Sequence, residues 1–192
     1  MTSERPFTNK VALITGAGSG IGRATALLMA SEGANVVLVG RTMSKVEAVE
    51  TEIRTKGGTA SAYALDVAEH QAVAEMVSSV ISDLGRIDVL VNNAGGIRAQ
   101  PFPDVTEETW DWTVDLNMKG LYFYMQEAAK RMMEQRSGTI VNIASTVATM
   151  AINDRLAYST SKGGVLAMTY SVAKDHLHDN IRCHAILPGR IH

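Results

Sequence analysis

The sequence predicts a single α/β domain built on a doubly wound parallel sheet, and three observations support this prediction. Six short runs rich in Val, Ile and Leu lack polar alternation, as do strands that are buried on both faces of a sheet. Five longer amphipathic stretches separate these runs, which is the pattern of right-handed βαβ units. The chain has 192 residues, 46% hydrophobic and 20% charged, which suits one globular core over residues 1–192.

The elements follow one another in regular alternation. The predicted strands occupy residues 11–15, 35–39, 60–65, 87–91, 139–143 and 181–187. The predicted helices lie between them, at about 20–32, 43–56, 68–84, 106–136 and 155–179. Periodicity cannot set the order of the strands, so we expect the order 3-2-1-4-5-6 by analogy with doubly wound dinucleotide-binding sheets.

Charge and cysteine content argue against several classes of function. A net charge of −2 gives no reason to expect nucleic acid or an anionic membrane as a partner. Cys183 is the single cysteine, so the chain cannot form an internal disulfide, which fits a reducing compartment. We expect it to be an inert thiol in or near the core. Residues 1–10 are too polar for a signal peptide and no apolar run reaches the length of a membrane span, so we expect a cytoplasmic protein.

A glycine-rich turn, Thr15-Gly16-Ala17-Gly18-Ser19-Gly20-Ile21-Gly22, follows the first predicted strand. Glycines let the backbone approach a pyrophosphate, and the next helix offers free N–H groups and the positive end of its dipole. Such a turn also serves simply to close a tight βα unit. Four glycines in seven residues, between a strand and a helix, favour a dinucleotide site over that alternative. We therefore expect cofactor contacts from Gly16, Ser19, Gly20, Ile21 and Gly22.

The end of the second strand bears on the choice of cofactor. Enzymes that use NAD commonly place an acidic residue there, about 20 residues beyond the glycine turn. Here Gly40 occupies that position, Arg41 follows it, and Thr42 adds a hydroxyl. A guanidinium suits a 2′-phosphate through bidentate hydrogen bonds, so we expect NADP(H) rather than NAD(H). In the alternative, Arg41 stacks on the adenine or points to solvent.

Polar residues also end the third and fourth strands. Asp66, in Leu65-Asp66-Val67, is placed either to accept a hydrogen bond from an adenine amino group or to cap the next helix, and its position leaves both open. The turn Asn92-Asn93-Ala94-Gly95-Gly96 should lie along the cofactor, with its Asn side chains holding backbone groups.

Two further positions stand out in the second half of the chain. Asn117, three residues before Gly120, is a poor choice inside a helix, and such a conflict indicates a kink or a functional position. Ser145 follows the fifth strand, either as a catalytic hydrogen-bond donor or as the start of a turn.

Tyr158 and Lys162 stand four residues apart in the last predicted helix and therefore share one face, one turn apart. An ammonium beside a phenol favours the ionised phenol, which suits it to acid–base chemistry near neutral pH. Taken alone, such a pair is more often an ordinary helix surface with a solvated lysine, because short motifs recur by chance. The motifs elsewhere in the chain favour the chemical interpretation.

Together these motifs resemble those of the short-chain dehydrogenase/reductase family, in its compact single-domain branch. The resemblance covers residues 9–189. Within the family, the sequence resembles the members that are similar to 3-oxoacyl-carrier-protein reductases. It rests on the order and spacing of Thr15-Gly16-x-x-x-Gly20-Ile21-Gly22, Asp66-Val67, Asn92-Asn93-Ala94-Gly95, Asn117, Ser145, Tyr158-x-x-x-Lys162 and Pro188-Gly189. Extended relatives such as sugar-nucleotide epimerases space the glycines differently.

The resemblance implies an NAD(P)-dependent oxidoreductase that interconverts a secondary alcohol and a ketone. It makes Tyr158 the acid/base, gives Ser145 the task of polarising the substrate oxygen, and has Lys162 hold the nicotinamide ribose. Asn117 would anchor a water in a proton relay. Other residues implied beside the cofactor are Asp66, Val67, Asn93, Ala94, Gly95, Pro188 and Gly189. The competing interpretation is a dinucleotide-binding regulatory or assembly subunit without turnover.

The substrate is expected to be a small carbonyl compound or alcohol. Its pocket should be lined by residues 96–103 and 146–157, with an apolar character from Met150, Ile152 and Leu156 and with Arg98 nearby. The helices at about 106–136 and 155–179 carry more apolar residues than one buried face needs, so they and the resemblance predict a homodimer or homotetramer.

Two expected absences complete the prediction. Family members usually continue past the Pro-Gly turn into a substrate lid and a last strand, whereas this chain stops at Arg190-Ile191-His192. We therefore expect the last strand of the family to be missing from the sheet. His176 and His178 lie two residues apart and point to different sides of a helix, so no metal site is expected.

Overall fold

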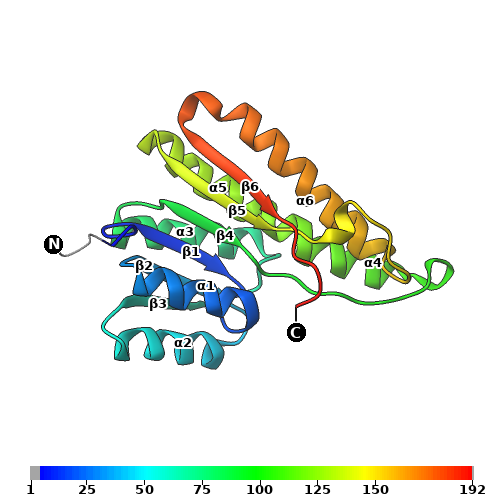
Figure 1. The fold of residues 1–192 in the computed structure, drawn as a ribbon, viewed down its shortest axis with the longest axis horizontal. Helices are drawn as coiled ribbons and strands as arrows, with labels where there is room; N and C mark the ends of the chain where they lie inside the picture. Colours follow the sequence, from blue (N-terminus) through cyan, green and yellow to red (C-terminus); the bar gives the residue numbers. More distant parts are fainter. Residues whose placement is uncertain (1–4, 192) are drawn as a thin grey trace.

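The computed structural model describes residues 5–191, which form a six-stranded parallel sheet with helices on both faces (Figure 1). The strand order is β3-β2-β1-β4-β5-β6, and every neighbouring pair is parallel. The predicted doubly wound order is therefore confirmed, and within the described residues β6 forms one edge. The strands are β1 (Val11–Thr15), β2 (Asn35–Gly40), β3 (Thr59–Ala64), β4 (Val89–Asn92), β5 (Gly138–Ile143) and β6 (Ile181–Ile186).

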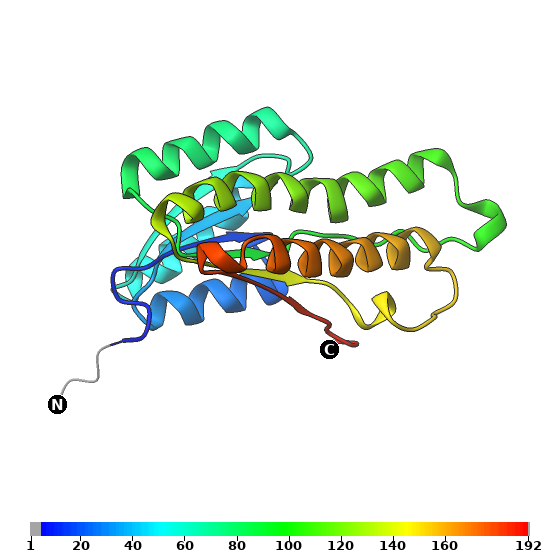
Figure 2. The same cartoon turned by 90° about the horizontal axis from the view of Figure 1, so that it is seen from above.

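The helices form two layers, one on each face of the sheet (Figure 2). One layer consists of α1 (Gly20–Ser31) and α2 (Met43–Thr55). The other consists of α3 (His70–Leu84), α5 (Gly120–Gln135) and α6 (Leu156–Asp175), with α4 (Glu107–Val114) preceding α5. Three short 3₁₀ turns complete the chain: η1 (Phe102–Asp104), η3 (Thr146–Ala148) and η4 (Leu177–Asp179).

Both faces of the central strands are packed. In β1, Leu13 joins the core beneath α3, α5 and α6, whereas Ile14 joins the core beneath α1 and α2. In β2, Val37 and Leu38 divide between the two cores in the same way. A strand that buries both faces has no polar side, which is why these strands appear in the sequence as continuous apolar runs.

The helix predicted at 106–136 contains an irregular turn. The π-helical segment η2 (Asp115–Lys119) joins α4 to α5, and the backbone N–H of Gly120 donates to the carbonyl of Asp115. A Cβ on Gly120 would lie 2.8 Å from the backbone oxygen of Val67, so this turn packs directly against the loop after β3. The conflict predicted at Asn117 therefore marks a real change of geometry, of a kind that is frequent at functional sites.

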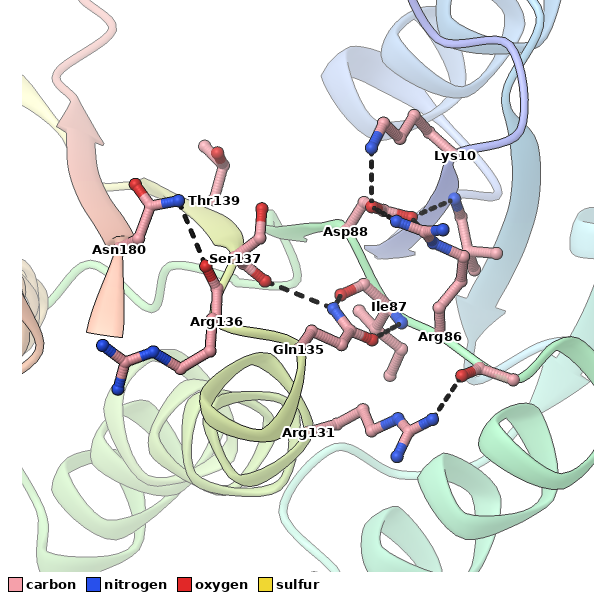
Figure 3. A network of polar contacts seen from close by, with 12 residues as sticks. Lys10, Arg86, Ile87, Asp88, Arg131, Gln135, Arg136, Ser137, Thr139 and Asn180 are labelled. Atoms are coloured by element: carbon pink, nitrogen blue, oxygen red, sulfur yellow. Dashed lines mark hydrogen bonds and ion pairs between the residues drawn. The ribbon is translucent and has the colours of Figure 1, made fainter.

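Asp88 links the amino ends of the two central strands β1 and β4 (Figure 3). Its carboxylate accepts hydrogen bonds from the Arg86 guanidinium at 2.6 and 2.7 Å, from the Val11 N–H at 2.9 Å and from the Lys10 ammonium at 3.2 Å. Burial alone would raise the pKa of Asp88, but these donors outweigh it and hold the pKa below its usual value. The ionised carboxylate therefore stabilises the fold at neutral pH.

We expect Asp88→Ala to lower the free energy of unfolding by about 2–3 kcal/mol near neutral pH, because three donors lose a charged acceptor. Since the pKa is lower in the folded than in the unfolded protein, this contribution is present above the unfolded value and is lost as the pH falls through the folded one. Urea denaturation near neutral pH and at about pH 3 measures both effects. Asp83→Ala, at an exposed position, is the control. An equal loss in both variants would contradict the assignment.

Candidate functional site

The glycine turn lies between the carboxyl end of β1 and the first turn of α1. Gly16 and Gly20 have φ of +66° and +53°, a region that other residues rarely adopt. Gly22 packs beneath the turn, where a Cβ would collide with the backbone oxygen of Gly16. A Cβ on Gly20 would meet no described atom within 4 Å, so the space above the turn is open. The hydroxyl of Ser19, the N-cap of α1, makes no capping hydrogen bond and is available to a ligand.

The loop after β4 fixes the shape of this turn. The Asn93 side chain donates to the carbonyls of Thr15 and Gly16, at 3.1 and 3.2 Å. The Thr15 hydroxyl accepts from the N–H groups of Asn93 and Ala94, each at 3.0 Å. The expectation that an Asn side chain holds backbone groups is thus met at Asn93.

The turn opens into a cleft of about 350 Å³ along the carboxyl ends of β1, β2 and β4. Among the predicted cofactor residues, those in its wall are Gly16, Ser19, Gly20, Ile21, Arg41, Val67, Asn93, Ala94 and Gly95. Asp66 is exposed outside this wall, and its carboxylate accepts from the N–H of Ala68 at 3.0 Å. The alternative that Asp66 caps the next helix is wrong, because the N-cap of α3 is Glu69. Its hydrogen bond to adenine stays a prediction.

Cationic side chains line the far end of this cleft. Arg41 and Lys45 both contribute to the wall, and within residues 5–191 neither forms an ion pair. A Cβ on Gly18 would lie 2.9 Å from the Cβ of Lys45, so the lysine stem packs against the glycine turn. Lys45 was not predicted; it lies in the first turn of α2, close in sequence to Arg41 at the end of β2.

Gly40 has a packing reason to lack a side chain. A Cβ there would lie 2.9 Å from Cγ1 of Val46, which is fully buried. An acidic residue at position 40 would have to displace that valine. Packing therefore explains why position 40 carries no carboxylate, and Arg41 next to it lies in the wall of the cleft.

A second cleft, of about 320 Å³, adjoins the first and shares Ile21, Asn93 and Gly95 with it. The structure brings together here residues that are well separated in the sequence. The predicted residues that line it are Ser145, Tyr158, Lys162, Pro188 and Gly189. They meet because β5, α6 and the segment after β6 all reach the carboxyl edge of the sheet.

Lys162 is 4% exposed, and its ammonium donates to the carbonyl of Ile143 at 2.7 Å. Burial lowers the pKa of Lys162 to about 8. The nitrogen lies 5.8 Å from the centre of the Tyr158 ring, so the two side chains are neighbours. An ammonium has three donors, and this single acceptor leaves two of them for a ligand.

Ser145 starts a turn, which is one of the two roles that its position suggested, and its catalytic role stays a prediction. It is the N-cap of η3, and its hydroxyl oxygen accepts from the N–H of Val147 at 3.4 Å. Because the hydroxyl acts as an acceptor in the turn, its proton remains free to be donated into the cleft.

The buried side chain of Asn117 holds the loop after β4. Its oxygen accepts from the N–H of Gly96 at 2.8 Å, and its nitrogen donates to the carbonyl of Gly96 at 2.9 Å. A Cβ on Gly95 would lie 2.7 Å from that oxygen and 3.5 Å from the ammonium of Lys162, so Asn117 and Lys162 border the same point. The predicted role of Asn117 as a water anchor stays a prediction.

The three residues expected to make the substrate pocket apolar do not line the cleft that holds Tyr158, and their contact with substrate stays a prediction. Met150, Ile152 and Leu156 line a separate groove of about 650 Å³ whose wall does not include Ser145, Tyr158 or Lys162. Leu156 precedes Tyr158 by two residues, which places the two on opposite sides of α6.

Arg98 lies in the loop after β4, and its side chain contacts two other residues of its own chain. It stacks on Trp112, with the guanidinium carbon 4.3 Å from the ring centre, and pairs with Glu108 at 2.9 Å.

Among residues 5–191, no three His, Cys, Asp or Glu side chains gather closely enough to hold a metal ion. No helix in this part of the chain is long and apolar enough to span a membrane.

Comparison with known proteins gives consistent matches over nearly the whole chain. The family model described as short chain dehydrogenase matches residues 10–192. The 3-oxoacyl-[acyl-carrier-protein] reductase of Thermotoga maritima is 40% identical over 182 residues, which are 95% of this chain and 74% of that protein.

Two crystal structures share the fold closely. NAD⁺-bound xylitol dehydrogenase has a TM-score of 0.93 and 38% identity, over 96% of this chain and 71% of the other. A metagenomic short-chain oxidoreductase in complex with NADP has a TM-score of 0.91 and 35% identity, over 96% and 84% of the two chains.

Proposed function

The chain belongs to the short-chain dehydrogenase/reductase family, and from this premise we propose that it interconverts a secondary alcohol and a ketone with Tyr158 as the acid/base. Family membership makes it an NAD(P)-dependent oxidoreductase acting on CH–OH groups. The observation that supports the finer proposal is the single cleft in which Ser145, Tyr158 and Lys162 meet beside the glycine turn.

The residues present fit a dinucleotide cofactor. Open space lies above Gly20 at the start of α1, and the hydroxyl of Ser19 is free to bind a phosphate. The two clefts share Ile21 and Asn93 in their walls, so a long ligand has a continuous path from Arg41 to Tyr158.

Each residue of the cleft has a defined task in the proposed reaction. A bound nicotinamide supplies or accepts the hydride. Tyr158 gives a proton to the substrate oxygen in reduction and takes it back in oxidation. Ser145 donates a hydrogen bond to the same oxygen, so two donors stabilise the negative charge that develops there. Lys162 favours the ionised phenol through its charge and holds the ribose with its free donors.

A panel of ketones and secondary alcohols, assayed with NADPH and NADH by the absorbance of the reduced nicotinamide, tests this function. We expect turnover of at least one member. Cofactor binding without any turnover across a broad panel would instead support the competing interpretation, a dinucleotide-binding subunit with a regulatory or assembly role.

We further propose that the cofactor is NADP(H), bound at its 2′-phosphate by Arg41, Thr42 and Lys45. One charged hydrogen bond contributes about 1.5–3 kcal/mol, so kcat/KM should favour NADPH over NADH by about 10- to 150-fold. We expect Arg41→Ala/Lys45→Ala to lower this ratio by about tenfold or more through the NADPH term alone, because NADH carries no phosphate at that position.

The matched control is Lys56→Ala, at the other end of α2, which should leave the ratio unchanged. Replacing the two cations is a cleaner test than Gly40→Asp, because any Cβ at position 40 presses on Val46. A parent enzyme that prefers NADH, or a ratio that the double variant does not move, would refute the assignment.

Assembly through α5 and α6 is the remaining part of the proposal. Both helices keep large apolar side chains exposed after folding: Tyr122 and Met133 on α5, Leu156 and Tyr170 on α6. Pairing of these helices between copies would bury that surface in a homodimer, or in the dimers of a homotetramer.

A further inference from the structure

The cleft that contains Tyr158 carries no negative charge in its wall. Among residues 5–191, no Asp or Glu lines this cleft, and its one charged lining residue is the buried Lys162. The segment after β6 lines the same cleft with Gly189 and Ile191 and carries Arg190 between them, at an exposed position. A carboxylate or phosphate group that entered the cleft would therefore be attracted by nearby cations and repelled by no carboxylate of the described wall.

Arg98 lies just outside this wall, because Ile97, the residue before it, lines the cleft. Its guanidinium carbon is 4.3 Å from the ring centre of Trp112. The far end of that ring touches the loop of the wall, since a Cβ on Gly96 would lie 2.7 Å from Cη2 of Trp112. Gly96 itself lines the cleft. The guanidinium is therefore held beside the cleft, one aromatic ring away from its wall.

The helix that packs against this loop places the guanidinium at the outer end of the cleft. Glu108, Trp112 and Leu116 are spaced four residues apart, so they follow one side of α4 and its continuation η2. Leu116, at one end of this row, lines the cleft proposed above for the cofactor. Arg98 contacts the other two residues of the row, since it stacks on Trp112 and donates to Glu108 at 2.9 Å. A substrate that extends from Tyr158 away from the cofactor would therefore approach Arg98.

The contacts of Arg98 leave its guanidinium able to bind an anion. Within the described residues its side chain makes one hydrogen bond, to Glu108, whose side chain is 84% exposed. An ion pair that is so exposed is weak and is readily exchanged for another. Stacking on Trp112 holds the guanidinium in place and leaves its other N–H groups for bidentate bonds to a carboxylate or a phosphate. Arg98 is thus held in position without being neutralised by a buried partner.

We propose that Arg98 binds an anionic group of the substrate, a carboxylate or a phosphate, and that the substrate is a ketone or secondary alcohol carrying such a group. This inference rests on the function proposed above and narrows its substrate class. Glu108 holds the guanidinium while the cleft is empty and releases it to the anion when substrate binds. Arg98 then determines specificity: it contacts the substrate away from the reacting carbon and takes no part in hydride or proton transfer.

Matched pairs of substrates test the preference for charge. A series of short oxo acids of increasing chain length, each beside its own methyl ester, tests the carboxylate, and dihydroxyacetone phosphate beside dihydroxyacetone tests the phosphate. We expect kcat/KM of the full chain to favour the charged member of at least one pair by about 10- to 150-fold, the effect of one charged hydrogen bond. The favoured pair identifies the anion. Turnover without preference for the charged member of any pair would overturn the inference and leave the proposed function standing.

Two variants with effects of opposite sign locate that preference. Arg98→Met keeps an unbranched stem against Trp112 and removes the charge, so it should lower kcat/KM for the charged compound about tenfold or more and leave its neutral partner unchanged. Glu108→Gln removes the competing carboxylate and should raise kcat/KM for the charged compound alone, by about two- to fivefold. An equal loss for both members of the pair in Arg98→Met would show a purely structural role and overturn the assignment. The absence of a gain in Glu108→Gln would refute the exchange of partners.

The fluorescence of Trp112 reports the same contact without turnover. The chain has two tryptophans, so Trp110→Phe leaves Trp112 as the only one. Because the guanidinium lies on its ring, we expect the charged ketones, added with oxidised cofactor so that no reduction occurs, to change its emission saturably. The neutral partners should not, and Arg98→Met should abolish the change. A saturable change without turnover of any compound would support the inference while the proposed function fails. Unchanged emission with every charged ketone would overturn the inference.

Discussion

Tyr158→Phe will lower kcat by about 10²–10⁴-fold while leaving cofactor affinity near that of the parent, because only the phenolic oxygen is removed from the cleft. The phenyl ring keeps its place on α6, and the ammonium of Lys162 keeps its hydrogen bond to Ile143. Steady-state kinetics on a substrate from the carbonyl panel and a fluorescence titration with NADPH measure the two quantities.

Tyr122→Phe is the matched control, since Tyr122 is exposed on α5 and lies outside both clefts. It should leave kcat unchanged. If Tyr158→Phe retained more than about a tenth of the parental kcat, the acid/base assignment of Tyr158 would be untenable.

Lys162→Met will have two effects of opposite sign. It should lower kcat/KM by at least about 10²-fold, because the cleft loses both the charge beside Tyr158 and the donors expected to hold the ribose. It should also stabilise the cofactor-free protein, because holding a buried ammonium costs free energy. A folded pKa of about 8 against an ordinary 10.5 corresponds to about 3 kcal/mol at neutral pH. Losing the hydrogen bond to Ile143 offsets about half of this gain.

The pH dependence separates this explanation from a simple gain in packing. The folded protein binds the Lys162 proton less tightly than the unfolded chain does. The cost of the buried charge is therefore full below about pH 8 and disappears as the pH rises towards 10.5. Urea denaturation without cofactor should show the variant about 1–2 kcal/mol more stable near neutral pH, with no advantage near pH 10. Lys130→Met, at an exposed position, should show no such trend; a variant less stable at both pH values would contradict the argument.

Much of the fold could be predicted because its determinants are local in the sequence. The runs around Leu13 and Val37 are apolar on both sides of the strand, and the glycine turn stands between a strand and a helix. The approach of Ser145 to Tyr158 follows from topology, since successive parallel strands deliver their carboxyl ends to one edge.

The features that could not be predicted depend on how elements pack together. The stem of Lys45 reaches the cleft because Gly18 lets it pack against the turn. The amide of Asn117 is used on Gly96 because a π-helical turn, seated against Val67, places it there. Met150 lines a separate groove because the segment after Ser145 folds towards the outer face of α6, and no periodicity encodes that direction.

The bonds from Asn93 to Thr15 and Gly16 have a consequence for how the cofactor site arises. They join residues 78 and 77 positions apart, so the conformation of the glycine turn is specified by chain made much later than the turn itself. The entropy of closing that loop must be overcome before the turn acquires its fixed shape, which makes it a late event in folding. A nascent chain that ends before β4 would contain the complete nucleotide-binding motif as sequence and still lack the rigid surface that recognises the cofactor.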